Sequence, residues 1–518
     1  MKHIRLLLLF SVLFFAGCAT NPVTGKSELT LISESNELSI GTKNYQPGQQ
    51  HGGGQYLLQP DVSAYVDEVG KRLAKISDRP SLPYEFVVLN DSVPNAWAMP
   101  GGKIAINRGL LYELNSEAEL AAVLSHEIVH AAARHGARSM ETGMVLQAGA
   151  AVIGAATANK KHGELAGAAA NVGAGLLGLK YGRDHESEAD HYGTIYMARA
   201  GYDPGAAITL QETFVRLAKD RKPNWLEGLF ASHPPSQERV DANRKLAATL
   251  PAGLESGEEE YRRRMAPLMK TRPAYAAYDE GRKALKQGNS KLALDMANRA
   301  IAAEPQEALF YGLRGDVRAK AGKLKQAESE YNDAIRRNGD YYDFYLQRGL
   351  VREKLHGAQE ARADLERSVA LLPTAPAHHV LGMLAQADGS EDQAIQHFRA
   401  AAGAGGEQGK AAFAALARLE IPRAPAGYFS VGKDYNAAGK LVLSVTNQSP
   451  VSARDMMIQV QVMKNLFVAD REETFFMIGT LKPGATRKME VSLKNKPGEG
   501  RPDLRKIKAK VSIAKLAE

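Results

Sequence analysis

The sequence is poor in cysteine: Cys18 is the only one in 518 residues. A disulfide framework and a metal site built from thiolates are therefore both excluded. Long apolar runs are also scarce, because the run from Leu6 to Phe15 is too short to span a bilayer and the Ala- and Gly-rich stretch at 144–179 is interrupted by polar residues. Lys and Arg form no dense patch with interleaved aromatics, so the net charge of +8 does not indicate a nucleic-acid-binding protein.

The first seventeen residues have the pattern of a secretory signal. Lys2 and Arg5 precede the apolar run from Leu6 to Phe15, and small residues lead up to Cys18. This ending resembles a bacterial lipobox, in which the cysteine is acylated and becomes the mature N-terminus. Ala19 resembles the residue that sorts such lipoproteins to the outer membrane. We therefore expect a lipid anchor on Cys18; a plain cleaved signal with an incidental cysteine is the alternative.

A repeat of about 34 residues occupies positions 276–405. In each of four units a glycine is followed twelve residues later by an alanine: Gly281 and Ala293, Gly315 and Ala327, Gly349 and Ala361, Gly382 and Ala394. This pattern resembles the tetratricopeptide repeat, whose small residues let paired helices pack closely. Stacked pairs leave a concave face suited to a protein partner, and a purely structural spacer is the alternative.

Beyond Pro422 the apolar residues alternate with polar ones, which is the period of a strand. Such runs lie at 441–445, 458–462, 489–493 and 507–513, with turn signals such as Lys482-Pro483-Gly484 between them. The pattern predicts a small all-β sandwich of roughly Ig-like type at 425–518. No residue in this part is a catalytic candidate.

The motif that carries chemistry lies on a helix predicted from Glu117 to His135 and closed at Gly136. It reads His126-Glu127-Ile128-Val129-His130. Histidines four residues apart lie on one helical face, so both imidazoles can reach one ion. Glu127 lies beside that ion, where it can take a proton from a bound water. The motif predicts a zinc site with Glu127 as general base; two surface histidines on an amphipathic helix are the alternative.

Zinc needs a third protein ligand and an open position for water. The spacing after the motif excludes the histidine or glutamate that other zinc peptidase classes use, and carboxylates are then few until residues 184–190. On a helix Glu186 and Asp190 share a face, whereas Glu188 points away. We expect Glu186 to be the third ligand and Asp190 to orient a ligating histidine. Glu188 is the competing ligand.

These motifs, followed by Ser232-His233-Pro234, resemble those of the HtpX and CAAX prenyl protease family of gluzincins over about residues 20–247. The resemblance implies an α+β zincin-type domain with one Zn²⁺ per chain. It also implies a substrate-binding edge strand, to which Asn95, Ala96, Trp97 and Ala98 correspond. His233 is then a latency switch that occupies the open position of the zinc, a transition-state donor or a structural residue. Arg239 is a further catalytic candidate or a structural ion-pair partner.

The signal and the repeats make the chain similar to periplasmic lipoprotein proteases of the BepA type. That resemblance implies a zinc endopeptidase anchored to the outer membrane, which cleaves misfolded or unassembled envelope proteins. The alternative is a lipid-anchored chaperone or assembly factor that binds envelope proteins through its repeats, with latent or minor proteolysis.

The expected boundaries are a signal peptide at 1–17, a lipid-anchored tether at 18–60, the peptidase domain at 61–250, a linker at 251–275, the repeats at 276–405 and the β-domain at 425–518. Within the peptidase domain, we expect 144–179 to form a close-packed helix pair or a lid.

Overall fold

The computed structural model describes residues 17–145, 181–220, 233–465, 468–494 and 500–517. Almost all of the expected signal peptide and of the Ala- and Gly-rich stretch therefore lies outside the described residues. The chain divides into two compact units, Met1–Val351 and Arg352–Glu518. None of the helices in the described ranges is both long enough and apolar enough to cross a membrane.

The first unit contains a three-stranded sheet whose central strand is fully buried. In spatial order the strands are β3 (Glu85–Leu89), β5 (Lys103–Asn107) and β4 (Ala96–Met99). Strand β5 runs parallel to β3 and antiparallel to β4. This order leaves β4 as an edge strand of the sheet.

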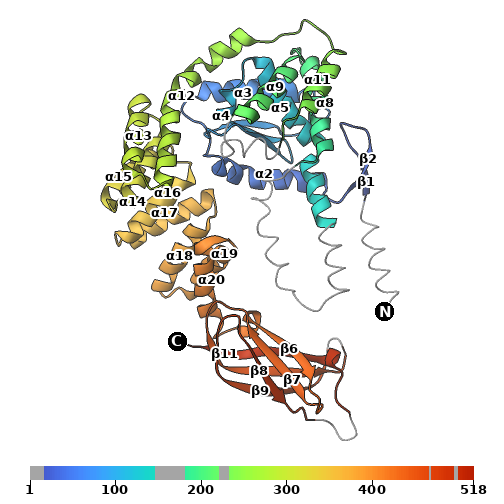
Figure 1. The fold of residues 1–518 in the computed structure, drawn as a ribbon, viewed down its shortest axis with the longest axis vertical. Coiled ribbons are helices and arrows are strands. Elements are labelled where there is room, and N and C mark those ends of the chain that lie inside the picture. The colour runs from blue at the N-terminus through green and yellow to red at the C-terminus, as the bar shows by residue number, and fades with distance from the viewer. Residues whose placement is uncertain (1–16, 146–180, 221–232, 466–467, 495–499, 518) are drawn as a thin grey trace. The chain divides into compact units, whose positions relative to one another are not determined.

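Helices cover both faces of this sheet (Figure 1). One face carries α3 (Pro60–Ala74) and α5 (Glu117–Ala132), and the other carries α2 (Glu34–His51). The short α4 (Arg108–Leu111) follows β5 directly. Around α5 pack α8 (Arg183–Arg199), α9 (Ala206–Asp220) and, against these two, α11 (Gln237–Ala247). The sheet edge β4 and the helices α5, α8 and α11 are the elements that position the site.

Residues 18–60, expected to form a tether with a wrapping segment, contain a hairpin followed by α2. The hairpin pairs β1 (Gly17–Thr20) with β2 (Ser27–Thr30), so the backbone of Cys18 is part of a strand. Helix α2 lies against the sheet, where the hydroxyl of Tyr45 donates to the carbonyl of Ile104 at 3.0 Å.

Helix α5 ends earlier than the sequence predicts. It stops at Ala132, and the chain turns at Arg134, whose φ of 61° lies in the left-handed region. The Nε atom of Arg134 donates to Oε2 of the fully buried Glu37 at 2.8 Å, so a residue of α2 fixes this turn. Gly136 lies inside the next helical segment, and the prediction that it closes α5 is wrong.

Paired helices fill the region of the predicted repeats. They are α12 (Glu258–Lys286), α13 (Ser290–Ala303), α14 (Ala308–Lys320), α15 (Leu324–Arg337), α16 (Tyr342–Lys354), α17 (Ala358–Leu371), α18 (Ala375–Ala387), α19 (Glu391–Ala402) and α20 (Gly406–Glu420). A Cβ atom at Gly315 would lie 2.6 Å from Tyr331, and one at Gly382 would lie 2.6 Å from Phe398. The predicted helical repeat region is confirmed, with small residues where the helices approach most closely.

The first repeat helix continues into the peptidase part of the same unit. Most of the segment 251–275, expected as a linker, belongs to α12, and the hydroxyl of Tyr261 donates to the carbonyl of Leu111 at 2.6 Å. Further along, the buried Glu307 accepts hydrogen bonds from Asn90 and from Tyr275. The start of the repeats therefore shares a core with the sheet domain.

The second unit ends in two three-stranded antiparallel sheets. One has the order β10 (Thr486–Val491), β7 (Leu441–Asn447), β6 (Phe429–Tyr435), and the other β11 (Ile507–Leu516), β8 (Ala453–Met463), β9 (Ala469–Leu481). Alternate residues of both sheets form a buried core that includes Leu443, Val445, Ile458, Val460 and Val511. The period-two prediction is confirmed, and the Ig-like type stays a prediction. Strands β6 and β9 were not predicted, because charged residues interrupt their apolar alternation.

Candidate metal centre

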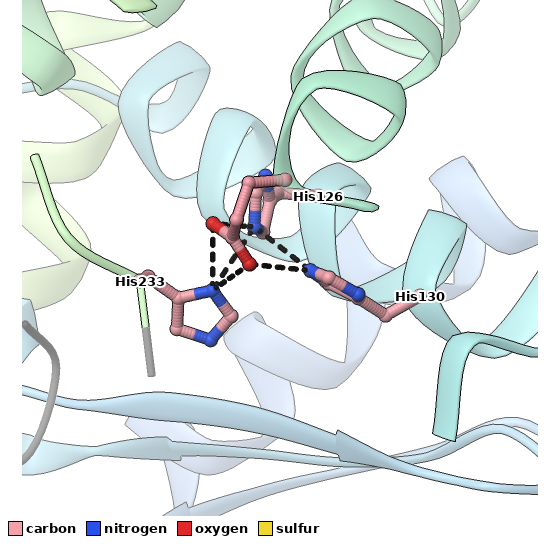
Figure 2. A group of neighbouring side chains, drawn as sticks. His126, His130 and His233 are labelled. Atoms are coloured by element: carbon pink, nitrogen blue, oxygen red, sulfur yellow. Dashed lines mark hydrogen bonds and ion pairs between the residues drawn. The ribbon is translucent and has the colours of Figure 1, made fainter. Parts of the chain in front are cut away.

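Two histidines of α5 and a carboxylate of α8 meet at one point (Figure 2). The Nε2 atoms of His126 and His130 lie 3.1 Å apart. Oε2 of Glu186 lies 3.6 Å from Nε2 of His126, and Oε1 lies 3.4 Å from Nε2 of His130. Nδ1 of His233 lies 2.9 Å from Oε1 of Glu186, so a fourth side chain joins the cluster from the segment before α11. One ligand atom from each of the four residues lies within 4.8 Å of the others.

The donor set suits a divalent cation. Imidazole nitrogens with one carboxylate oxygen are ligands that Zn²⁺ takes in open catalytic sites. Two ring nitrogens at 3.1 Å need a proton or a cation between their lone pairs, so a cation can occupy the space that they face. His130, Glu186 and His233 are all buried, so the charge of the carboxylate has little water to stabilise it.

The protonation preferences of these groups differ, and each has a physical cause in its neighbours. Burial opposes a charged ring at His126, yet Asp190 and Glu186 raise the pKa of His126 to about 10. Burial also opposes ionisation of Glu186, but the adjoining His233, His126 and His130 hold the pKa of Glu186 far below its usual range. Burial lowers the pKa of His130, which keeps that ring neutral, as a metal ligand must be. The cluster therefore offers an ionised carboxylate and a neutral imidazole to a cation.

Asp190 lies one turn after Glu186 and orients the ring of His126 through a hydrogen bond. Its Oδ1 lies 3.0 Å from Nδ1 of His126, which leaves Nε2 of that ring directed at the cluster. Asp190 in turn accepts two hydrogen bonds from Arg239, from Nε at 2.7 Å and from Nη2 at 2.8 Å. Nη1 of Arg239 also lies 3.1 Å from Oε2 of Glu186. The guanidinium thus ties together the carboxylates of Glu186 and Asp190.

His135, which was not predicted to belong to the site, orients His130. Nδ1 of His135 lies 2.9 Å from Nδ1 of His130, and Nε2 of His135 lies 3.1 Å from Oε2 of Glu188. Glu188 also pairs with Arg138 at 3.5 Å, so it faces away from the cluster. The ring of Tyr181 stacks on His130 with centroids 4.0 Å apart. His135 reaches back to His130 because of the left-handed turn before it, which no sequence signal marks.

Glu127 occupies the position that a general base needs. Its side chain is 2% exposed, and its Oε1 lies 3.6 Å from Nε2 of His233. Its Oε2 is buried and has no hydrogen-bond partner among the residues that the structure describes. Burial raises the pKa of Glu127, although His233 and His126 oppose that rise. An unpaired carboxylate oxygen beside a cation site, with a raised proton affinity, can accept a proton from water.

Strand β4 borders the cluster and contains three of the predicted edge-strand residues, Ala96, Trp97 and Ala98, whereas Asn95 directly precedes it. The carbonyl of Asn95 accepts a hydrogen bond from the amide of Asn107, and the carbonyl of Ala98 accepts one from the hydroxyl of Tyr181. The ring of Trp97 meets Tyr45 edge-on with centroids 6.0 Å apart. Ala96 lines a cavity next to His126 and Glu127.

That cavity has a volume of about 40 Å³. Its wall is mostly apolar, with Val123 from α5, Met197 from α8, and Leu210 and Phe214 from α9. A volume of this size holds about three water molecules. No sequence signal marks this cavity, because α9 carries no motif and contributes only an apolar face.

Comparison with known proteins identifies the family. Residues 60–247 match the model described as "Peptidase family M48". The chain is 26% identical to the beta-barrel assembly-enhancing protease of Escherichia coli over 66% of its length and 75% of the relative's. It is 31% identical to the "Putative beta-barrel assembly-enhancing protease" of Vibrio cholerae over 38% of its own length, but spans only 41% of that relative. The metalloprotease YcaL of Escherichia coli is 30% identical over 35% of this chain and 70% of its own length.

The matched range contains the whole cluster, from His126 to His233, and its helices α5, α8 and α11. The resemblance predicted from the three motifs is therefore confirmed, and the predicted enzyme class, a zinc metalloendopeptidase, agrees with it. The chain belongs to peptidase family M48 and is a metallopeptidase similar to the beta-barrel assembly-enhancing proteases.

Proposed function

We propose that this protein is a zinc-dependent endopeptidase of the bacterial periplasm, which cleaves misfolded or unassembled envelope proteins. One observation carries the proposal: ligand atoms of His126, His130 and Glu186 converge beside the unpaired carboxylate oxygen of Glu127. The names of the relatives support a substrate among envelope proteins. A lipid on Cys18 would hold the chain at the outer membrane.

In this proposal His126, His130 and Glu186 hold one zinc ion. Asp190 fixes the ring of His126 and His135 fixes the ring of His130, in both cases through the Nδ1 atom of the ligand histidine. Zinc, when bound there, polarises a water molecule and the carbonyl of the peptide to be cut. Glu127 would accept a proton from a water molecule beside it and would later pass that proton to the leaving amine. Its burial serves both steps, because a carboxylate with a raised pKa gains and releases a proton more readily near neutral pH.

The substrate would bind as an extended strand along β4. Ala96, Trp97 and Ala98 lie on the edge strand beside α5 and Asn95 directly precedes it, and an added strand pairs through main-chain atoms. Such pairing tolerates many side chains, which suits unfolded substrates. The small apolar cavity beside Glu127 would accept one side chain next to the cut bond.

His233 would act as the switch of a latent site. Its Nδ1 lies 3.3 Å from Nε2 of His126 and contacts both oxygens of Glu186, so its ring would compete with a water molecule for the same metal. Arg239 would act as a structural partner, because Asp190 and Glu186 already engage its guanidinium. The repeats would present unfolded envelope proteins to the site or bind a protein partner.

Cleavage of casein by the purified full chain tests the proposal. We expect cleavage, its loss on treatment with a chelator, and its return on addition of zinc. Cleavage that survives complete removal of metal would contradict the proposal.

The second candidate function is a chaperone or assembly factor with latent proteolysis, and the contact between His233 and Glu186 favours it over a freely accessible site. The variant Glu127→Gln separates the two functions. Under the endopeptidase proposal, Glu127→Gln fails to complement cells that lack the wild-type chain and accumulate unassembled outer-membrane proteins. Under the chaperone alternative, the variant complements these cells fully.

A further inference from the structure

The β-domain carries an unusual group of exposed apolar side chains. Phe476 is 70% exposed and Ile478 is 82% exposed, the two highest values among the large apolar residues that the structure describes. Both lie on β9, an edge of the sheet β11–β8–β9 (Figure 1). Met457 of β8 pairs with Phe476 on one side and with Ile513 of β11, 47% exposed, on the other. One row across the outer face of the sheet is therefore entirely apolar.

Cations flank this row on the same face. In the register of the sheet, Lys508 and Lys510 lie beside the outward Gln461 and Gln459, and Lys515 lies beside Arg454. All four cationic side chains are exposed, and none forms an ion pair with any other residue in the described part of the chain. We call Lys508, Lys510, Lys515 and Arg454, together with Phe476, Ile478, Met457 and Ile513, the basic–apolar face.

The acidic groups on this face are few and engaged. Glu472, at the β9 edge, accepts hydrogen bonds from Gln459 and Gln461. Asp455 accepts a weak hydrogen bond from the amide of Gly479. Glu472 interacts electrostatically with Lys510 without forming an ion pair, so Lys508, Lys515 and Arg454 supply the unpaired positive charge around the apolar row in the described part of the chain.

We propose that the basic–apolar face binds the surface of an anionic phospholipid bilayer. Exposed apolar side chains next to free lysines are the combination that binds at the membrane interface, where the rings and alkyl groups insert among the headgroups and the ammonium groups meet phosphates. Long lysine side chains can lie along the apolar surface and keep their charge at the phosphates. A protein partner fits less well, because lysine is depleted in the buried centre of protein interfaces.

This binding is independent of the proposed peptidase function and of any lipid on Cys18. The β-domain lies outside the residues matched to the peptidase family. The full chain with Cys18→Ser, which cannot be acylated, isolates the contribution of the face. Sedimentation with vesicles of phosphatidylethanolamine and phosphatidylglycerol, against vesicles of phosphatidylcholine alone, measures it.

We expect the Cys18→Ser chain to sediment with the phosphatidylglycerol vesicles and not with the neutral ones. Each of Lys508→Gln, Lys510→Gln and Lys515→Gln should lower the partition coefficient about five-fold, and added salt should weaken binding. Phe476→Ser with Ile478→Ser should remove most of the binding that resists salt. Leu57→Ser and Lys325→Gln, exposed positions of the other unit, serve as matched controls and should change nothing.

Far-ultraviolet circular dichroism of each variant checks that the exposed substitutions leave the fold intact. Equal binding to neutral vesicles, or unchanged binding of the variant with both Phe476→Ser and Ile478→Ser, would overturn the proposal. Capture of an acidic protein through Lys508 and Lys510, without binding to anionic vesicles, would also overturn it and assign the face to a protein partner.

Discussion

Nδ1 of His233 lies 2.9 Å from Oε1 of Glu186, and both side chains are buried. The two residues come from different segments, Glu186 from α8 and His233 from the turn before α11. This contact is the basis of our proposal that His233 keeps the site latent at rest.

The variant His233→Ala should cleave casein faster than the wild type. Removal of one hydrogen bond to a charged group changes the free energy of the closed state by about 1.5–3 kcal/mol, so we expect an increase of about tenfold or more. His191→Ala, an exposed histidine of α8 outside the cluster, is the control and should leave the rate unchanged. A slower rate would indicate a donor role for His233, and an unchanged rate would leave only a structural role.

The variant Glu127→Gln should keep its zinc and lose cleavage. The amide has nearly the same shape as the carboxylate but cannot accept the proton, and the loss of a general base costs about 10²–10⁴-fold in rate. Casein cleavage and metal content, measured on the same preparation, check both parts. Glu212→Gln, at an exposed ion pair with Arg244, is the matched control. Wild-type cleavage by Glu127→Gln would refute the assignment.

The variant Asp190→Asn should weaken zinc binding about 10–100-fold, because Asp190 orients the ring of His126 and also engages Arg239. Competition with a chelator measures the affinity, and excess zinc should restore cleavage. If zinc affinity is unchanged while cleavage is lost, Asp190 acts on the substrate and not on the metal.

Asp316 of α14 gives a prediction for the stability of the repeats. Burial and the neighbouring Asp343 raise the pKa of Asp316 from 3.8 to about 7, although Tyr331, which donates a hydrogen bond to it, and Arg282 oppose that rise. Because the folded chain holds this proton more tightly than the unfolded chain, stability declines as the pH rises from about 4 to about 7, and the full penalty remains above that range.

The variant Asp316→Asn has no such proton to lose and keeps an acceptor for Tyr331. It should melt at a higher temperature than the wild type in mildly alkaline buffer, and the difference should shrink as the buffer is acidified. Thermal unfolding followed by circular dichroism at several pH values checks this. A difference that grows towards low pH would contradict the raised pKa.

The parts of the site that follow a local period could be predicted from the sequence. Helical spacing placed His126 and His130 on one face, and the same geometry placed Glu186 and Asp190 together and Glu188 apart. The glycines of the repeats likewise marked close helix contacts such as that between Gly315 and Tyr331.

The parts that depend on distant residues could not be predicted. Arg134 adopts its left-handed turn while paired with Glu37 of α2, and that turn brings His135 back to His130. Strand β9 carries charged residues on its outer side, which hides its period, and its exposed Phe476 and Ile478 became meaningful only once the neighbouring strands were known.

The most direct test of the account is the zinc content of three proteins purified in the same way: the wild type, Glu186→Ala and Glu188→Ala. We expect one zinc per wild-type chain, loss of that zinc from Glu186→Ala, and full retention in Glu188→Ala. In the wild type the carboxylate of Glu188 contacts His135 and not the cluster. Retention of zinc by Glu186→Ala, with loss from Glu188→Ala, would contradict the convergence of His126, His130 and Glu186 on one ion.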